Sequence, residues 1–290
     1  MGTNNCIHSD ARSVRLAATP SGLAPFGRLT MTPKFRAPLL AAAILASAGA
    51  AEAQTLVGLT ADNMLVRIDA ATRRASAPVR VTGAEGRVIG IDVRPANGML
   101  YGLTDANQLV TIDAATGRAT QVSRLSTPFV SGGRAVVDFN PVADRLRVMG
   151  VSGQNLRINV ETGAVVIDGA LKYADGAAQS GTAPRIVAGA YTNSAVGATA
   201  TALYTMDTLL RTYNLQAPPN DGVQAPRGTL PDLPAGVAFD ILADGAGGNM
   251  GYLLAAGTLH SVALDTGAPT VLGAVTGLPQ SEIIDIAAMR

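Results

Sequence analysis

One segment of the chain occurs twice in nearly the same form. GLTADNMLVRIDAATRRA (residues 58–75) is followed, forty-four residues later, by GLTDANQLVTIDAATGRA (residues 102–119). Repetition at a period of about 20 to 50 residues indicates an array of similar units, each too small to bury its own apolar surface. The fold must therefore be one in which such units pack against one another.

The second copy extends to a four-part unit over residues 88–122. Its runs VIGIDV, MLYGLT, QLVTID and RATQV are separated by short turns rich in Pro, Gly, Asn and Asp. Four such runs predict an antiparallel sheet of four strands. Similar units follow at residues 135–167, 185–216 and 236–272, and the period is near 48 residues.

The first unit is incomplete, and this decides between architectures. It starts at Leu56 with the second run, and the missing first run stands at the other end of the chain, in EIIDIAAMR (residues 282–290). A C-terminal strand that completes the N-terminal sheet closes a β-propeller and removes its exposed edges, whereas a solenoid or a sandwich needs no split unit. The sequence predicts an all-β propeller of five four-stranded blades, forming a single domain over residues 54–290. A sixth blade would need another unit within residues 215–232.

The strands of the first unit are apolar on both faces. Aliphatic residues stand at adjacent as well as alternate positions, as in Val57, Leu59, Leu65, Val66 and Ile68. A strand that is covered on both faces has this pattern. We therefore expect each blade to be packed between two neighbours.

The first 53 residues differ in composition from the rest. After Met31, a short basic region precedes an apolar stretch that ends in Ala51-Glu52-Ala53, the small-x-small pattern that a signal peptidase cleaves. We expect residues 31–53 to be a signal peptide and residues 1–30 to result from an upstream start codon chosen in error. The apolar stretch is shorter than the roughly 20 residues that cross a bilayer. The protein is therefore expected to be periplasmic or extracellular, with no membrane span after cleavage.

Without this leader the chain has few reactive groups. It has no cysteine and no tryptophan, and Lys172 and His260 are its single lysine and histidine. These counts exclude a cysteine nucleophile, a thiolate zinc site and a multi-histidine metal centre. Residues 54–290 hold 17 of the 22 basic and 19 of the 21 acidic residues, with no patch suited to neutralising phosphates. Nucleic acid is therefore not an expected partner.

The repeats also resemble those of a known family. The segment VDFNPVADRLRVMGVSGQNLRINVETG (residues 137–163), with AYTNS at Ala190 and QAPPNDG at Gln216, is similar to the uncharacterised bacterial family called domain of unknown function 4394. The similarity extends from about Leu56 to the end of the chain, and the FNP and PPNDG motifs are specific to the family. The resemblance implies a secreted or envelope-associated, propeller-like protein. It implies no reaction and no catalytic residues.

The aspartates of the first runs recur with the repeat. Spacing places Asp92, Asp138 and Asp240 at one position, with Gly189 in the fourth unit and Asp285 in the closing strand. If the first run is innermost, these carboxylates surround the central channel, where mutual repulsion raises their pKa values unless a cation lies among them. Calcium takes oxygen ligands and is the one cofactor that such a ring suggests. The recurrence favours the alternative, in which each carboxylate accepts backbone hydrogen bonds and joins blade to blade.

The third unit departs from the repeat in its polar residues, which are Asn140, Asp144, Arg145, Arg147, Asn155, Arg157 and Asn159. Alternation places Arg145 and Arg147 on one face, beside the strand of Arg157. Paired guanidiniums can bind a carboxylate or sulfate, as in an anionic sugar or a peptide terminus. The alternative is a set of ion pairs between blades, with the first two arginines bonded to Asp138 and Asp144. The candidate ligand-binding residues are Asp92, Asp138, Asn140, Arg145, Arg147, Arg157, Asp240 and Asp285.

Two function classes fit these features. The first is an exported, non-catalytic binding or scaffolding propeller, expected to be a monomer, that holds a glycan, a small anionic ligand or a protein. The second is a carboxylate-dependent hydrolase, such as a glycosidase with two channel acids about 5 to 9.5 Å apart. The absence of tryptophan argues against the second class, because aromatic platforms commonly line sugar sites. We prefer the binding class and assign no catalytic residue and no metal ligand.

Overall fold

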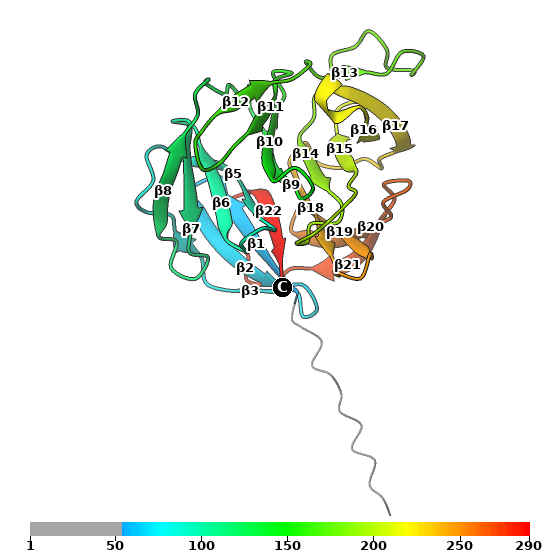
Figure 1. Ribbon diagram of the computed structural model, residues 1–290. Helices are drawn as coiled ribbons and strands as arrows, with labels where there is room; N and C mark the ends of the chain where they lie inside the picture. The colour runs from blue at the N-terminus through cyan, green and yellow to red at the C-terminus, as the bar shows by residue number, and fades with distance from the viewer. Residues whose placement is uncertain (1–53) are drawn as a thin grey trace, which may run out of the picture. The chain divides into compact units, whose positions relative to one another are not determined.

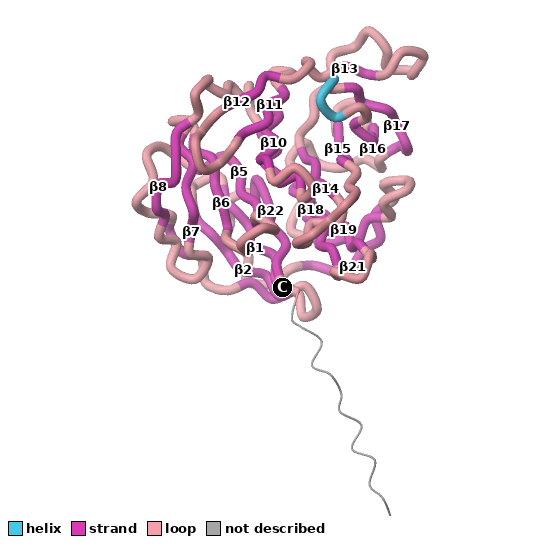
Figure 2. The backbone as a smooth tube through the Cα atoms, viewed as in Figure 1, coloured by secondary structure: helices cyan, strands magenta, loops and turns pink. Residues whose placement is uncertain are grey.

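The computed structural model of the protein describes residues 54–290. These residues form an all-β propeller whose five blades are arranged in a ring (Figure 1). Figure 2 shows that strands and loops make up nearly all of this part of the chain, and its one helix is the short 3-10 turn η1 (Pro219–Asp221). The predicted signal peptide and the predicted upstream extension lie outside the described residues.

Each blade is one sheet, and its strands follow one another from the channel outward. Blade 1 contains β22 (Ile283–Met289), β1 (Thr55–Thr60), β2 (Met64–Asp69) and β3 (Arg74–Ala75), with β4 (Val79–Arg80) also paired to β2. Blade 2 contains β5 (Val88–Val93), β6 (Leu100–Thr104), β7 (Gln108–Ile112) and β8 (Ala119–Arg124). Blade 3 contains β9 (Ala135–Asn140), β10 (Arg145–Gly150), β11 (Asn155–Ile158) and β12 (Val165–Ile167).

The last two blades differ in their outer strands. Blade 4 contains β14 (Ala188–Tyr191), β15 (Leu203–Asp207), β16 (Thr212–Gln216) and β17 (Val223–Thr229), and β13 (Lys172–Tyr173) runs parallel to β17 at its outer edge. Blade 5 contains β18 (Val237–Ala243), β19 (Asn249–Ala255), β20 (Thr258–Val262) and β21 (Pro269–Ala274).

The C-terminal strand completes the first blade. β22 pairs antiparallel with β1, with Leu56 opposite Ala288, and Figure 1 shows the red C-terminal strand beside the blue N-terminal one. Residues 215–232 hold the end of β16, η1 and β17, which belong to blade 4. The prediction of five blades with a shared first blade is therefore confirmed, and these residues form no sixth blade.

The first strand of each sheet lies next to the channel. The five inner strands β22, β5, β9, β14 and β18 contact one another in a closed circle, yet each pairs in a sheet only with the second strand of its own blade. Each inner strand is therefore a sheet edge, with N–H and C=O groups that no strand ladder satisfies. Those groups need other partners, because an unpaired buried backbone group is costly.

Strand register corrects the predicted equivalence of Gly189 and Asp285. Asp92 lies opposite the second residue of LYGLT in β6. The second residues of the matching runs LYTMD and LVGLT lie opposite Ala190 and Ala287, so alanine occupies the aspartate position in blades 4 and 1. Asp285 stands two residues before Ala287, on the same face but one pleat away. Spacing alone misleads here because the connections between blades differ in length.

The core lies between blades. Among residues 54–290, five clusters of buried apolar side chains occupy the five junctions of adjacent blades. Val57 and Leu59 face blade 2, while Leu56 and Val66 face blade 5, so the first unit is covered on both faces as predicted. The cluster between blades 3 and 4 is the smallest, with six buried residues. That junction therefore depends more than the others on polar contacts.

A glycine in an outer hairpin lets blade 3 pack against blade 2. Gly163 has a φ of 73°, and a Cβ at this position would overlap the carbonyl group of Arg124. The Gly163 carbonyl accepts the Ser126 N–H at 2.8 Å across the same junction. Both the backbone conformation and the lack of space therefore require glycine.

Replacing Gly163 by alanine is expected to lower the free energy of unfolding by about 3 kcal/mol or more, because a backbone overlap adds to the strain of the positive φ. Gly98→Ala is the matched control, since Gly98 has a φ of 68° and nothing within 4 Å of the added Cβ. Its cost should be about 1 kcal/mol. Urea unfolding measures both values, and equal losses would show that the contact between blades at Gly163 contributes nothing.

Candidate functional site

Four carboxylates of the inner strands, which we call the axial aspartates, accept hydrogen bonds from the backbone of the next blade. The four pairs are Phe139 N–H to Asp92 (2.6 Å), Tyr191 N–H to Asp138 (2.9 Å), Ala288 N–H to Asp240 (2.6 Å) and Ile91 N–H to Asp285 (2.8 Å). Each carboxylate thus satisfies an edge amide that has no strand partner. In this geometry the axial aspartates join blade to blade.

Register also decides what the second carboxylate oxygen binds. The Ile241 N–H bonds to its own neighbour Asp240 at 2.6 Å, because the preceding blade has Ala190 at the aspartate position. Asp138 has no such bond, since the amide that follows it already bonds to the preceding blade. Where the preceding blade has no aspartate at this position, the backbone amide of the inner strand therefore donates to the aspartate of its own strand.

The junction between blades 4 and 5 has a different link. Ala190 provides no carboxylate, and two asparagines bond reciprocally instead. Asn249 Oδ1 accepts the Asn193 N–H at 2.7 Å, and Asn249 Nδ2 donates to Asn193 Oδ1 at 2.8 Å. Asn193 has a φ of 58°, a conformation that asparagine adopts more readily than most residues. The AYTNS motif therefore has a structural role at this junction.

Burial raises the pKa values of the axial aspartates. Asp92, Asp138 and Asp240 are only 4 to 6 % exposed. Burial first, and the charge of neighbouring carboxylates second, raise the pKa of Asp92 and Asp138 well above the usual range. Burial raises the pKa of Asp240 to about 6, and it also raises the pKa of Asp285. Burial thus disfavours the charged form of these carboxylates.

Three of the axial aspartates could supply ligands to a cation. Oxygen atoms of Asp92, Asp138 and Asp240 lie within 4.8 Å of one another. Calcium takes about six to eight oxygen ligands, and five of the six oxygens of these three carboxylates already accept backbone amides. These three carboxylates therefore offer few free oxygen ligands for calcium, which is the alternative to the structural role that the recurrence favours.

Arg147 lies buried between blades 3 and 4, with 1 % of its surface exposed. Its guanidinium donates to Asp168 (2.5 Å), Asn220 (2.7 Å), Asn155 (2.8 Å) and the Tyr191 hydroxyl (3.2 Å). These bonds satisfy the buried charge at the junction with the smallest apolar cluster. The predicted pairing of Arg147 with Asp138 is wrong, because its carboxylate partner is Asp168.

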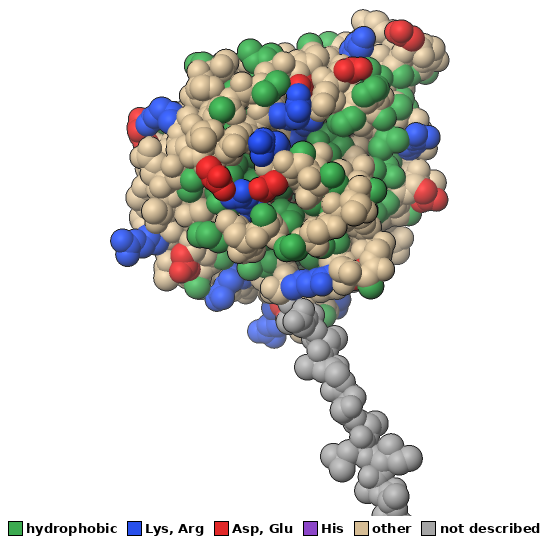
Figure 3. Space-filling view, in the orientation of Figure 1, with side chains coloured by type: hydrophobic (Ala, Val, Ile, Leu, Met, Phe, Trp, Pro, Cys, Tyr) green, Lys and Arg blue, Asp and Glu red, His purple; other side chains and the backbone are tan. Residues whose placement is uncertain are grey.

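The other two predicted arginines are more accessible. Figure 3 shows basic side chains on the face over β10 and β11. Arg145 is exposed and donates to backbone carbonyls of its own hairpin. Arg157 is partly exposed and binds Asp168 through two bonds of 2.7 and 2.9 Å. Burial raises the pKa of Asp168, but the bonds from Arg157 and Arg147 outweigh it and hold that pKa below its usual value.

The pairing predicted for Asp144 also needs correction. Asp144 takes two bonds from Arg94 of blade 2, at 2.8 and 2.5 Å, and these bonds lower its pKa. Arg94 also forms an ion pair with Glu161 at 3.1 Å, so the ion pairs join blades 2 and 3.

Asn140 accepts hydrogen bonds from two backbone amides of its own hairpin and shapes the turn. One feature of the sequence points to Arg94. It comes directly before Pro95, as Asn140 comes directly before Pro141 in the next unit, so the two residues occupy equivalent positions.

Sequence reasoning missed Arg134, which spans the channel. From the start of β9 it donates to the Ile284 carbonyl of blade 1 at 2.6 Å and forms an ion pair with Glu282. Gly236 of blade 5 leaves space for this pair, because a Cβ there would overlap both side chains. A residue just before a strand carries no periodic signal, so the pattern of the repeat could not identify it.

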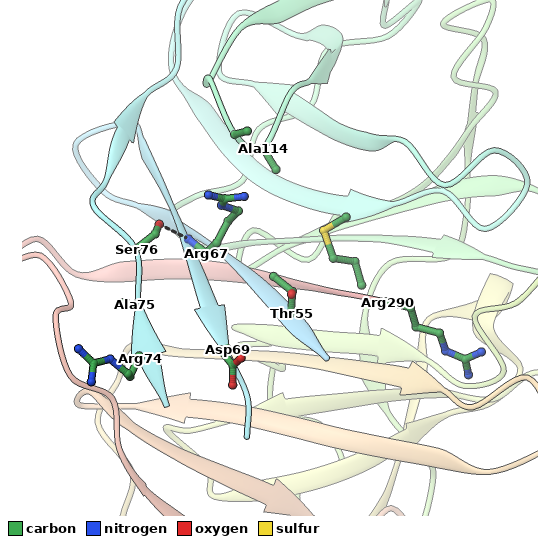
Figure 4. Close-up of a pocket in the computed structure, with 10 residues that line it drawn as sticks. Thr55, Arg67, Asp69, Arg74, Ala75, Ser76, Ala114 and Arg290 are labelled. Carbon is green, nitrogen blue, oxygen red and sulfur yellow. Dashed lines mark hydrogen bonds between the residues drawn. The ribbon is translucent and has the colours of Figure 1, made fainter. Parts of the chain in front are cut away.

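Two pockets that are lined by several charged residues lie apart from the predicted ligand-binding residues. The larger, which we call the axial pocket, has about 690 Å³ and lies where the inner strands of blades 3, 4, 5 and 1 begin. Its charged lining residues are Arg134, Arg185, Arg211, Asp232 and Glu282. The smaller has about 440 Å³ and lies on blade 1 near the C-terminus (Figure 4), where Arg74 and Arg290 stand at opposite ends. None of the eight predicted residues lines either pocket.

The fold and the axial contacts define a five-bladed β-propeller whose blades are linked by buried carboxylates. Residues 51–287 match the family described as "Domain of unknown function (DUF4394)", and the chain belongs to that family. Comparison with curated proteins gives no match. Within the part of the chain that the structure describes, no helix is long and apolar enough to cross a bilayer.

Two solved structures of similar proteins are described as having unknown function. A protein from Bacteroides caccae is 12% identical, with 76% of this chain and 73% of that chain covered and a TM-score of 0.43. A protein from Bacteroides thetaiotaomicron VPI-5482 is 13% identical, with 81% of this chain and 70% of that chain covered and a TM-score of 0.47.

Asp240→Asn is expected to destabilise the fold more at pH 4 than at pH 7.5. The folded pKa of about 6 lies above the ordinary value of 3.8, so protonated Asp240 stabilises the fold at low pH. This contribution is lost as the pH rises from about 4 through about 6, and linkage makes the difference between pH 4 and pH 7.5 about 2 kcal/mol. Urea unfolding at the two pH values measures it.

Asp113→Asn is the control for this pH dependence. Asp113 is exposed, and backbone bonds from Ala115 and Thr116 lower its pKa. Its contribution to stability is present at neutral pH and is lost as the pH falls, so the pH dependence of its replacement has the opposite sign. A cost of Asp240→Asn that is constant, or larger at pH 7.5, would contradict the raised pKa.

Arg147→Gln is expected to cost about 3 kcal/mol or more of unfolding free energy, because it leaves buried polar partners without their donor. Arg145→Gln removes an arginine from the same strand, but at an exposed position, and should change stability by less than about 0.5 kcal/mol. Urea unfolding of the two variants compares them directly. Similar costs for both would contradict the assignment of Arg147 to the junction between blades 3 and 4.

Proposed function

We propose that this protein is an exported, non-catalytic binding or scaffolding propeller of the periplasm or the extracellular space. The observation that carries the proposal is the use of the axial aspartates in bonds between blades. In this geometry the most acidic part of the channel stabilises the ring. Side chains at the two rims of the propeller, rather than these aspartates, are then available to bind a partner.

The same observation weighs against a glycosidase. Hydrolysis of a glycosidic bond needs two carboxyl groups that flank the substrate, about 5 to 9.5 Å apart, and one of them must receive or deliver a proton there. Asp92, Asp138 and Asp240 have raised pKa values, which suits a general acid, but they are buried and packed together. A sugar ring has no access between groups whose oxygens lie within 4.8 Å of one another.

The proposed partner is a glycan, a small anionic ligand or a protein, bound by a monomer. Arg145 is exposed and forms no ion pair among the described residues. Arg157 has a side chain 34 % exposed, although its charge is shared with Asp168. These two arginines, together with Asn140 at the turn that precedes Arg145, support the predicted binding surface on blade 3.

The purified protein is expected to bind without turnover. Chromogenic glycosides and esters incubated with it between pH 4 and pH 8 should show no hydrolysis above background, while a glycan array or a thermal-shift screen of anions should give saturable binding. Asp138→Asn is the diagnostic variant, because it should leave binding unchanged. Hydrolysis by the wild-type protein that disappears in a folded Asp138→Asn variant would establish the hydrolase instead.

A further inference from the structure

We propose that the axial pocket binds a small organic anion, with its anionic group on Arg185 and Arg211 and its apolar body against Leu209 and Leu233. This rests on the proposed binding function and names a site and a ligand class for it. The pocket lies at the rim where four of the five inner strands begin, and its volume of about 690 Å³ is in the range typical of sites for small molecules.

The floor of the axial pocket is a fixed ion pair. Arg134 is held by Glu282 and by the Ile284 carbonyl, and its side chain is 16 % exposed. Because Gly236 lacks a side chain, the pair lies directly against the backbone of blade 5. The charge of Arg134 is therefore largely matched by Glu282.

The two remaining arginines have terminal guanidinium nitrogens that are available to a ligand. Arg185 and Arg211 are exposed, and neither forms an ion pair among residues 54–290. Arg211 uses Nε to bind the Leu230 carbonyl at 3.1 Å, which fixes the side chain and leaves its terminal nitrogens as donors. With Arg134 and Glu282 paired, Asp232 is the one other acidic residue of the lining. The pocket thus favours an anion over a cation.

The apolar part of the lining selects an organic anion over an inorganic one. Leu209 is 64 % exposed at the turn between β15 and β16, and Leu233, Val151 and Val187 also line the pocket. An exposed leucine beside two arginines gains by covering its surface with an apolar group. Molecules such as benzoate and phenylacetate combine a carboxylate for the arginines with an aromatic ring for the apolar lining.

The pocket on blade 1 is the natural comparison, because Arg67, Arg74 and Arg290 line it. Figure 4 shows Arg74 and Arg290 far apart, at opposite ends of that pocket. Arg290 also donates to the Ala243 carbonyl. An anion that binds through charge alone would use both pockets, whereas the proposed ligand requires the axial one.

Isothermal titration of the purified protein with phenylacetate tests the proposal. Phenylacetamide, which has the same body without the charge, and sulfate, which has charge without the body, are the comparison probes. Phenylacetate should bind at least tenfold more tightly than either. Arg185→Gln and Arg211→Gln should each weaken phenylacetate binding by about tenfold or more, as expected for loss of a charged hydrogen bond, and Leu209→Ala should weaken phenylacetate binding but not sulfate binding.

Two variants are the controls. Arg118→Gln removes an exposed arginine outside both pockets, and Arg74→Gln removes an arginine of the blade 1 pocket. Both should bind phenylacetate like the wild type. Thermal unfolding checks that all variants are folded. No phenylacetate binding at millimolar concentration, or an equal loss in Arg74→Gln, would overturn the axial site. A glycan or protein ligand that binds equally well to Arg185→Gln and Arg211→Gln would overturn this site while leaving the proposed binding function intact.

Discussion

The hydrogen bond from a buried carboxylate to the edge amide of the next blade is the interaction on which the ring depends. Each inner strand has sheet partners on one side only, so its channel-side amides would be buried and unpaired without an acceptor from outside the blade. Asp92, Asp138 and Asp240 provide that acceptor at one level of the channel, and Asp285 provides it one pleat away. Burying a carboxylate is costly, and the amides offset part of that cost.

The junctions that lack this bond are held by other polar groups. Ala190 leaves blades 4 and 5 without a carboxylate link, and the reciprocal bonds of Asn193 and Asn249 take its place. Blades 3 and 4 share the smallest apolar cluster, and the buried Arg147 of blade 3 joins them through its bonds to Asn220 and Tyr191 of blade 4. The AYTNS and PPNDG segments of the fourth unit, around Asn193 and Asn220, thus contribute polar contacts at junctions between blades.

The sequence predicted the ring, but not the side-chain partners. A split first unit is visible in the order of the runs, because closure requires the missing strand at the other end of the chain. The exact register is not visible, since connections of unequal length shift Asp285 by one pleat from its predicted position. Partners such as Asp168 for Arg147, or Glu282 for Arg134, come from other elements. Neither repeat spacing nor strand alternation contains information about contacts of that kind.

The charges of the channel and of its rim are coupled through Arg134. The Ile91 amide and, more weakly, Arg134 oppose the effect of burial on the pKa of Asp285, so Arg134 interacts electrostatically with that carboxylate. A fully ionised set of four carboxylates would repel an anion at the rim where the inner strands begin. Burial disfavours the charged form of all four carboxylates, which lessens that repulsion. The burial that raises these pKa values thus also makes the rim less unfavourable for an anion.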